Sequence, residues 1–239
     1  MQQGCAMTTA AIQIVAFDVF GTVVDWHGSI MREMQQRYPA VDADAFAGAW
    51  RDGYQPAMNL VRQGNLGWTR IDALHRRILD EILPRFGLAA MPEAERQQLN
   101  QVWHRLAPWP DAVPGLQRLK QRFVITPLSN GNIALLTHMA KHAGLPWDCV
   151  LSAEVFKAYK PDPAVYLGAA DVFGVAPEQV MLVAAHNSDL AAARACGLAT
   201  AYVERPLERG AARSKDVSPR AENTYHCTDF IDLATQLGC

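Results

Sequence analysis

The sequence predicts an α/β fold, in which a parallel β-sheet forms the core and a separate block of helices is inserted into it. Short apolar segments alternate with helical segments through the second half of the chain, and a wholly helical stretch follows the first apolar segment. Strands that alternate with helices form parallel sheets with crossover connections. The chain has 239 residues, of which 50% are hydrophobic, so it is long enough to bury a sizeable core.

The N-terminal half of the chain holds one predicted strand followed by helices. Ile12–Phe17 is a short, apolar and β-branched run that ends at Asp18, which is typical of a buried strand. From about Gly28 to Leu106 the apolar residues recur at helical spacing, and prolines and glycines divide this stretch into about four helices. We therefore expect a helical domain at residues 26–107, inserted into a core domain made of residues 8–25 and 108–239.

The other strands are predicted after Pro108. Apolar runs that end in polar residues predict strands, and stretches of helical spacing bounded by Pro or Gly predict the helices between them. The predicted strands are Phe123–Leu128, Cys149–Leu151, Val180–Ala184, Thr200–Val203 and, at the edge, Tyr225–Cys227; the predicted helices include Leu116–Gln121, Pro163–Phe173, Asp189–Cys196 and Phe230–Leu237. Arg205–Asn223 is rich in charge, Pro and Gly, and we expect it to be a surface loop.

The composition excludes several classes of protein. Lys and Arg number 22 against 24 Asp and Glu, and a net charge of −2 argues against a basic nucleic-acid binder. No apolar run approaches the roughly 18–20 residues that cross a bilayer, and no secretory signal pattern is visible. The five cysteines are scattered and never form a Cys-x-x-Cys pair, which argues against a disulfide framework or a zinc site. We expect a cytoplasmic protein with neither nucleic-acid nor membrane partners.

Four clusters of polar side chains lie in the sequence at, or a few residues after, the ends of predicted strands. In a parallel sheet the carboxyl ends of the strands meet at one edge, where ligands bind. Each side chain has an ordinary explanation when it is taken alone, since Asp18, Ser129 and Asp189 could cap a turn or helix and Lys160 could be solvated. Their coincidence at successive strand ends favours one shared crevice. The clusters are Asp18 with Thr22, Ser129 with Asn130, Lys160, and His186 and Asn187 with Asp189.

Four motifs in this order resemble those of the haloacid dehalogenase superfamily. Phe17–Asp25 resembles the first motif, Leu128–Asn130 the second and Lys160–Pro163 the third, while Ala185–Asp189 lies where the fourth belongs. The resemblance covers nearly the whole chain, because the helical insertion resembles the cap domain that follows the first strand in this superfamily. It implies a doubly wound, Rossmann-like core with an α-helical cap and an aspartyl nucleophile at Asp18.

The first and fourth motifs favour carbon–halogen cleavage over phosphoryl transfer. Phosphatases of the superfamily carry a second Asp two residues after the nucleophile, where this chain has Phe20. They also carry an acid early in the fourth motif, whereas Asp189 is the one carboxylate of this stretch. A divalent ion beside a phosphate needs hard oxygen ligands, and few are present. A halide leaves as a stable anion and needs no proton, so we expect neither a metal nor another cofactor.

The match is closer with the type II 2-haloacid dehalogenases. Trp50-Arg51 with Tyr54 resembles the segment that carries their halide- and substrate-binding arginine, and Tyr166 matches an active-site tyrosine. The resemblance implies that Asp18 attacks carbon 2 of a small 2-haloalkanoate to form an aspartyl ester. It assigns Thr22, Lys160 and Asp189 to catalysis, and Arg51, Ser129, Asn130 and Tyr166 to the binding of the substrate. In addition, we expect His186 to take part in catalysis and Phe20 and Asn187 to contact the substrate.

The fourth motif departs from the family at three positions. Ala184 and His186 stand where those dehalogenases have Ser and Asn, and Ser188 replaces an aromatic residue. We expect Asp189 to activate the water that hydrolyses the ester, with His186 relaying the proton or acting as the base, because the ordinary pKa of histidine, about 6.5, suits that role.

Two other functions stay open at this point. One is a phosphatase with an atypical first motif, for which activity would depend on magnesium. The other is a protein that binds a small carboxylate without turnover, if the changes at Ala184 and His186 have ended catalysis. A homodimer formed through the helical insertion is also left open.

Overall fold

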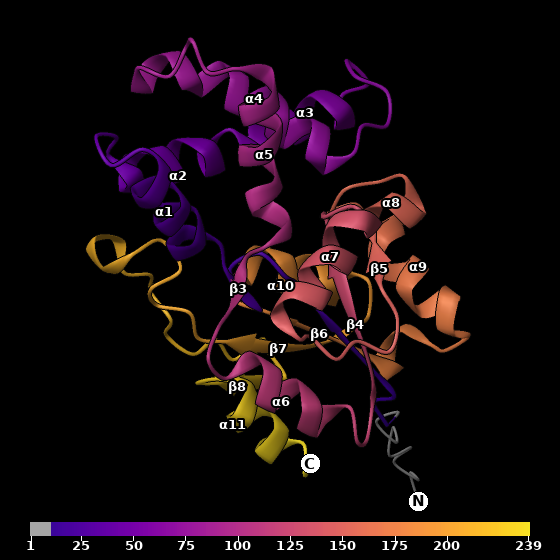
Figure 1. The fold of residues 1–239 in the computed structure, drawn as a ribbon. Helices are drawn as coiled ribbons and strands as arrows, with labels where there is room; N and C mark the ends of the chain where they lie inside the picture. Colours follow the sequence, from indigo (N-terminus) through magenta and orange to yellow (C-terminus); the bar gives the residue numbers. More distant parts are fainter. Residues whose placement is uncertain (1–10) are drawn as a thin grey trace, which may run out of the picture.

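The core of the protein is a parallel β-sheet. The computed structural model describes residues 11–239, and within this range six strands lie in the order β5-β4-β1-β6-β7-β8 (Figure 1). Every neighbouring pair is parallel, which confirms the predicted α/β class. The strands are β1 Ile14–Phe17, β4 Val124–Ser129, β5 Leu151–Ser152, β6 Val180–Ala184, β7 Ala199–Val203 and β8 Tyr225–Cys227.

Helices cover both faces of this sheet. Val15 and Phe17 of β1 belong to one apolar cluster, which includes buried residues of α6, α7 and α11. Ile14 and Ala16 belong to another, with residues of α9 and α10. Alternate residues of a strand point to opposite faces, so the sheet is doubly wound. The core helices are α6 Ala112–Leu119, α7 Ile133–Ala143, α8 Ala153–Phe156, α9 Pro163–Phe173, α10 Asn187–Ala195 and α11 Phe230–Gln236.

A block of helices lies between β1 and the rest of the core. It starts after β2 (Val24–Asp25) and ends before β3 (Ala107–Pro108), and these two short strands pair antiparallel to form its neck. The sequence predicted about four helices here; the structure has α1 Trp26–Arg37, α2 Ala43–Asp52, α3 Tyr54–Arg62, α4 Ile71–Ile82 and α5 Glu93–Asn100, with 3₁₀ turns at Leu83–Phe86 and Gln101–His104. We propose that residues 26–107 form a cap domain; residues 8–10 of the predicted core lie outside the described range.

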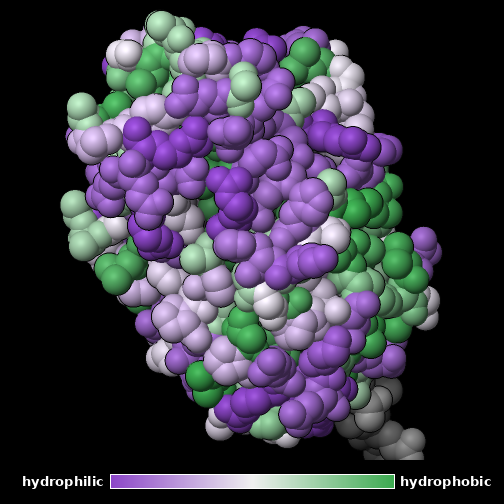
Figure 2. All heavy atoms as spheres, viewed as in Figure 1, coloured by the Kyte–Doolittle hydropathy of each residue, from purple (hydrophilic) through white to green (hydrophobic). Residues whose placement is uncertain are grey.

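Polar contacts hold the helical block against the core. Asp72 of α4 accepts a hydrogen bond from the Asn132 side chain at 2.9 Å, and its other oxygen lies 2.9 Å from His104 Nε2. Arg70 forms an ion pair with Glu154 of α8 at 2.5 Å. Figure 2 shows hydrophilic side chains over most of the block and over its junction with the core, whereas apolar side chains gather on the flank near α8 and α9.

The segment after β7 differs from the expectation of a surface loop. Within residues 204–224, Arg205 and Glu208 are only 5% and 4% exposed. Farther along the segment, Arg213 forms an ion pair at 2.7 Å with Asp44 of α2. The charged composition suggested solvation, but several of these charges are neutralised by partners on other elements. The segment therefore bridges the core and the helical block.

No helix within residues 11–239 is both long enough and apolar enough to span a membrane.

The contact between α6 and α11 gives a test of the packing. A Cβ on Gly115 would lie 2.7 Å from the carbonyl carbon of Phe230 and 2.4 Å from its Cβ. Gly115→Ala is therefore expected to destabilise the fold by roughly 1–3 kcal/mol, although alanine is the better helix former. Urea unfolding measures this loss. The control is Gln117→Ala, on the exposed face of the same helix, for which we expect a change within about 0.5 kcal/mol. Equal stability of the two variants would contradict the packing argument.

Candidate active site

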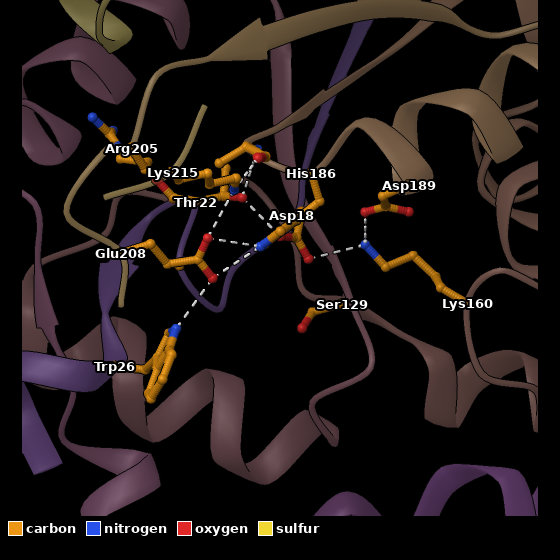
Figure 3. Close-up of polar contacts among 12 residues, drawn as sticks. Asp18, Thr22, Trp26, Ser129, Lys160, His186, Asp189, Arg205, Glu208 and Lys215 are labelled. Atoms are coloured by element: carbon orange, nitrogen blue, oxygen red, sulfur yellow. Dashed lines mark hydrogen bonds and ion pairs between the residues drawn. The ribbon is translucent and has the colours of Figure 1, made fainter. Parts of the chain in front are cut away.

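The carboxylate of Asp18 lies at the carboxyl end of β1 and is almost fully buried. Thr22 donates a hydrogen bond to Asp18 Oδ2 at 2.7 Å, and the Thr22 hydroxyl accepts one from the backbone N–H of Ala185 at 3.0 Å. The turn between them needs a positive φ of 85° at Gly21, which glycine adopts without strain. Thr22 thus fixes one oxygen of Asp18 to the end of β6 (Figure 3).

Lys160 joins Asp18 to Asp189. Its ammonium lies 3.0 Å from Asp18 Oδ1 and 2.5 Å from Asp189 Oδ2, and its side chain is buried. Burial alone would lower the pKa of Lys160, but the two carboxylates outweigh it and raise that pKa above its ordinary value. Tyr166 of α9 donates to the other oxygen of Asp189 at 2.6 Å, and burial raises the pKa of this phenol. Asp189 is thus engaged at both oxygens.

His186 connects Asp18 to a residue that sequence reasoning missed, Glu208. Its Nδ1 lies 3.0 Å from Asp18 Oδ2, and its Nε2 lies 2.9 and 3.0 Å from the two oxygens of Glu208 (Figure 3). Burial opposes protonation of the imidazole, but Glu208 and Asp18 raise the pKa of His186 to about 9. At neutral pH the ring is therefore a cation held between two anions. Among the residues that the structure describes, no hydrogen bond joins the side chain of His186 to that of Asp189.

The carboxylate of Glu208 is built into the junction of the core and the helical block. It accepts hydrogen bonds from Trp26 Nε1 at 3.2 Å and from Lys215 Nζ at 2.9 Å. Burial alone would raise the pKa of Glu208, but His186 and Lys215 hold it well below its ordinary value. Arg205, three residues before Glu208, holds this segment against the turn after Asp18, because it donates a hydrogen bond to the Thr22 carbonyl at 2.9 Å. The carboxyl ends of parallel strands meet at one edge of a sheet. The segment that follows β7, which contains Glu208, could therefore have been predicted to lie near Asp18.

The carboxyl group of Asp18 stays ionised in this environment. Burial would raise its pKa, but Lys160 and His186, together with the Thr22 hydroxyl, hold the pKa well below the ordinary range. Phe20 lies two residues farther along, at the foot of the helical block, with its ring edge-on to Tyr54 at 6.3 Å. An ionised carboxylate that has an aromatic residue, and no second carboxyl group, two positions farther on is suited to attack carbon.

Arg51 approaches the site from α2. Its guanidinium stacks over the ring of Tyr54, with Cζ 4.3 Å from the ring centroid, and one of its buried nitrogens has no hydrogen-bond partner within residues 11–239. On the core side, Asn130 accepts a hydrogen bond from the backbone N–H of Lys160 at 2.8 Å. Both side chains carry N–H donors and line the same cavity as Asp18.

The site residues line a cavity of about 730 Å³ between the core and the helical block. It brings together most of the predicted residues, namely Asp18, Phe20, Arg51, Asn130, Lys160, Tyr166, His186 and Asp189. Thr22 and Ser129 are fully buried and do not line it; the Ser129 hydroxyl accepts a hydrogen bond from the Gly131 N–H at 3.1 Å. Asn187 does not line it either, since its oxygen accepts a hydrogen bond from Asn223.

The comparisons with known proteins agree with this geometry. The model of a hydrolase family, described as haloacid dehalogenase-like hydrolase, matches residues 12–197. The chain belongs to the haloacid dehalogenase-like hydrolase family. Among the family's curated members, (S)-2-haloacid dehalogenase 4A of Burkholderia cepacia is 31% identical over 82% of this chain and 84% of its own length.

Two solved structures of the family are also similar. One is a defluorinating L-2-haloacid dehalogenase, with 45% sequence identity, a TM-score of 0.91, and coverage of 95% of this chain and 96% of the other. The second is another L-2-haloacid dehalogenase with the same identity and TM-score, covering 95% and 100%. Both confirm the resemblance that the four sequence motifs indicated.

The position of His186 between two carboxylates predicts how stability depends on pH. The folded pKa of about 9 exceeds the ordinary value near 6.5, so the folded state holds the proton more tightly than the unfolded state. This contribution is complete below about pH 6.5 and is lost as the pH rises through about 9. We expect the free energy of unfolding of the wild type to fall by up to about 3 kcal/mol across this window.

The comparison variant is His186→Gln, which cannot titrate. We expect it to be less stable at pH 6 and to lose less stability between pH 6 and pH 9, as measured by urea unfolding at several pH values. Parallel pH dependences for the two proteins would show that His186 is not held as a cation.

Proposed function

We propose that this protein is a hydrolytic dehalogenase that converts a small 2-haloalkanoate to a 2-hydroxy acid and halide through an aspartyl ester. One observation carries the proposal: the carboxylate of Asp18 is kept ionised by Lys160 and His186, and its neighbour two residues on is the aromatic Phe20 rather than a second acid. The (S)-2-haloacid dehalogenases among the relatives support it.

In the first step, a carboxylate oxygen of Asp18 attacks carbon 2 of the substrate, and the carbon–halogen bond breaks as the ester bond forms. The electron pair of the broken bond leaves with the halide, so no proton is required. Negative charge grows on the departing halogen, and donors aimed at it stabilise the transition state. Arg51 and Asn130, with the ring of Phe20, are the lining groups that we assign to this task. Attack opposite the leaving group inverts a chiral carbon.

Hydrolysis of the ester depends on the change in charge at Asp18. Esterification removes the negative charge that faces His186 Nδ1, and an imidazole that has lost an anionic neighbour gives up its proton more readily. We propose that His186 releases its proton to solvent, and that the neutral imidazole, oriented by Glu208, then takes a proton from the attacking water. The hydroxide attacks Cγ of Asp18, the ester C–O bond breaks, and the leaving alkoxide oxygen takes the proton of the new Asp18 carboxyl group. The carboxylate of Asp18 and the imidazolium of His186 are thereby restored.

In this scheme the other predicted residues hold the reacting groups in place and do not react themselves. The sequence predicts that Asp189 activates the water, but both of its oxygens are engaged, by Lys160 and by Tyr166. We propose that Asp189 and Tyr166 hold the ammonium of Lys160 against Asp18, and that Thr22 and Ser129 fix the loops beside it. The substrate carboxylate would then be bound by backbone N–H groups near Asn130.

A cytoplasmic location without a nucleic-acid partner is part of the same proposal, because the net charge is −2 and no basic excess is present. A homodimer formed through the cap helices stays a prediction.

The first test is halide release from fluoro-, chloro- and bromoacetate and from both enantiomers of 2-chloropropionate, in the presence of EDTA. We expect turnover that survives the chelator and that falls at least about a thousandfold in Asp18→Asn, because the nucleophile is gone. Absence of release from every substrate would overturn the proposal. Hydrolysis of phosphate esters that requires magnesium would favour a phosphatase instead.

The second test concerns the base. Glu208→Gln keeps the size of the side chain but removes the anion that orients His186, so we expect ester hydrolysis to slow by roughly tenfold to a hundredfold while ester formation persists. Intact-mass spectrometry after mixing with (S)-2-chloropropionate should then show enzyme that carries one propionate unit.

The matched control is Glu204→Gln, which removes the carboxylate of a second His–Glu pair in the chain. Glu204 lies 2.8 Å from His226 Nε2, away from the cavity. We expect no accumulation of ester in this variant. Accumulation in both variants, or in neither, would remove Glu208 from the mechanism.

A further inference from the structure

The cavity is larger than a three-carbon haloacid requires. Its volume is about 730 Å³. The heavy atoms of 2-chloropropionate fill on the order of 200 Å³ at most, if each takes no more than the ~30 Å³ share of a water molecule. The lining beyond Asp18 and Lys160 is mixed, because it includes the aromatic side chains of Phe20 and Tyr54 as well as the polar side chains of Gln55, Ser188 and Ser214. The free space therefore has room for a longer substrate, and polar groups are present to bind part of it.

The lining carries more positive than negative charge. Lys160, Lys215 and His186 face the three lining carboxylates, and these groups balance one another. Four arginines remain, and none of them has a carboxylate partner inside the cavity. Two of them pair with aspartates of α2 outside it, at 3.3 Å and 2.7 Å. The arginines are Arg51, Arg62, Arg209 and Arg213.

Arg51 and Arg62 have no acidic partner at all within residues 11–239. Arg51 lies deep in the cavity, where the first step places the halide. Arg62, at the end of α3, is exposed and stands toward the mouth. One monocarboxylate substrate brings a single carboxylate and the departing halide, both of which are used near Asp18. A second anionic group on the ligand would match the charge that is left at Arg62.

Arg62 is held in place by its own contacts. It donates to the carbonyl oxygen of Lys160 at 2.5 Å and to the side chain of Asn59 at 2.7 Å. These bonds use only part of the five N–H donors of a guanidinium, so others remain for a ligand. A guanidinium fixed in this way binds a carboxylate with little loss of side-chain entropy.

The backbone of Lys160 sets the distance between the two ends of such a ligand. Its ammonium contacts Asp18 and its carbonyl accepts from Arg62, so Arg62 stands about one lysine side chain away from the nucleophile. A linear 2-haloacid of five or six carbons, with its second carboxylate at the far end, spans a similar length. A four-carbon diacid is too short to use both groups.

We propose that the site accepts 2-haloalkanedioates of five or six carbons, and that Arg62 recognises their distal carboxylate. This inference rests on the proposed dehalogenase function and extends it to a class of substrate.

The experiment measures kcat/KM for halide release by the purified full-length protein. The substrates are (S)-2-chlorosuccinate, (S)-2-chloroglutarate and (S)-2-chloroadipate, each beside its analogue with an amide in place of the distal carboxylate, and (S)-2-chloropropionate as the reference. We expect the five- or six-carbon diacid to exceed its amide by roughly tenfold or more, with a smaller ratio at four carbons. Raising the ionic strength should reduce the ratio.

The variant Arg62→Gln should bring the diacid-to-amide ratio close to one. The control is Arg77→Gln on α4, which removes one positive charge from an exposed arginine outside the cavity and should leave the ratio unchanged. Equal kcat/KM values for diacid and amide in the wild type would overturn the inference. An Arg62→Gln variant that slows every substrate by the same factor would also overturn it, because Arg62 would then only hold the Lys160 loop in place. Release of halide from chloropropionate in either case leaves the proposed function standing. No release from any substrate overturns both.

Discussion

A row of alternating charges is the feature on which the rest of the site depends. It runs from Asp189 through Lys160, Asp18, His186 and Glu208 to Lys215, and the carboxylates and cations alternate at contact distances of 2.5–3.0 Å. Removing an ion from water costs several kcal/mol unless it is paired, so no inner member of the row can be neutralised without a cost to its neighbours. Asp18, the nucleophile of the proposed mechanism, stands in the middle and is held as an anion from both sides.

The fold brings this row together from parts of the chain that are far apart. Asp18 follows β1 and His186 follows β6, so both come from the edge where the parallel strands end, while Lys160 lies in the loop between α8 and α9. Glu208 comes from the 204–224 segment after β7, which is fixed to the turn behind Asp18 by the bond from Arg205 to the Thr22 carbonyl. The same segment pairs with α2 through Arg213 and Asp44. The position of the helical block and that of His186 are therefore linked through one piece of chain.

The sequence was enough to predict the class of fold and most of the site, because both follow from local patterns. The strand Val180–Ala184 has the same bounds in the structure, since it is a continuous apolar run between polar residues. The sequence analysis did not predict the strands β2 and β3. Each has only two residues and so shows no alternation of apolar and polar side chains, and their pairing depends on the neck that joins the helical block to the core. Glu208 was missed for a related reason. Its burial depends on contacts with Trp26 of α1 and with His186 before α10, and a charged segment with Pro and Gly otherwise indicates a solvated loop.

The alternation of charge also explains why an ester at Asp18 would be short-lived. While Asp18 is ionised it satisfies both Lys160 and His186, and the row is in its most favourable state. Esterification removes the central anion and leaves two cations on either side of a neutral carbonyl, at a buried site where their mutual repulsion is weakly screened. The row regains its anion when His186 gives up its proton and water restores the carboxylate. The arrangement that keeps Asp18 charged in the free enzyme would thus also favour its release from the proposed intermediate, so one set of contacts would serve both proposed steps.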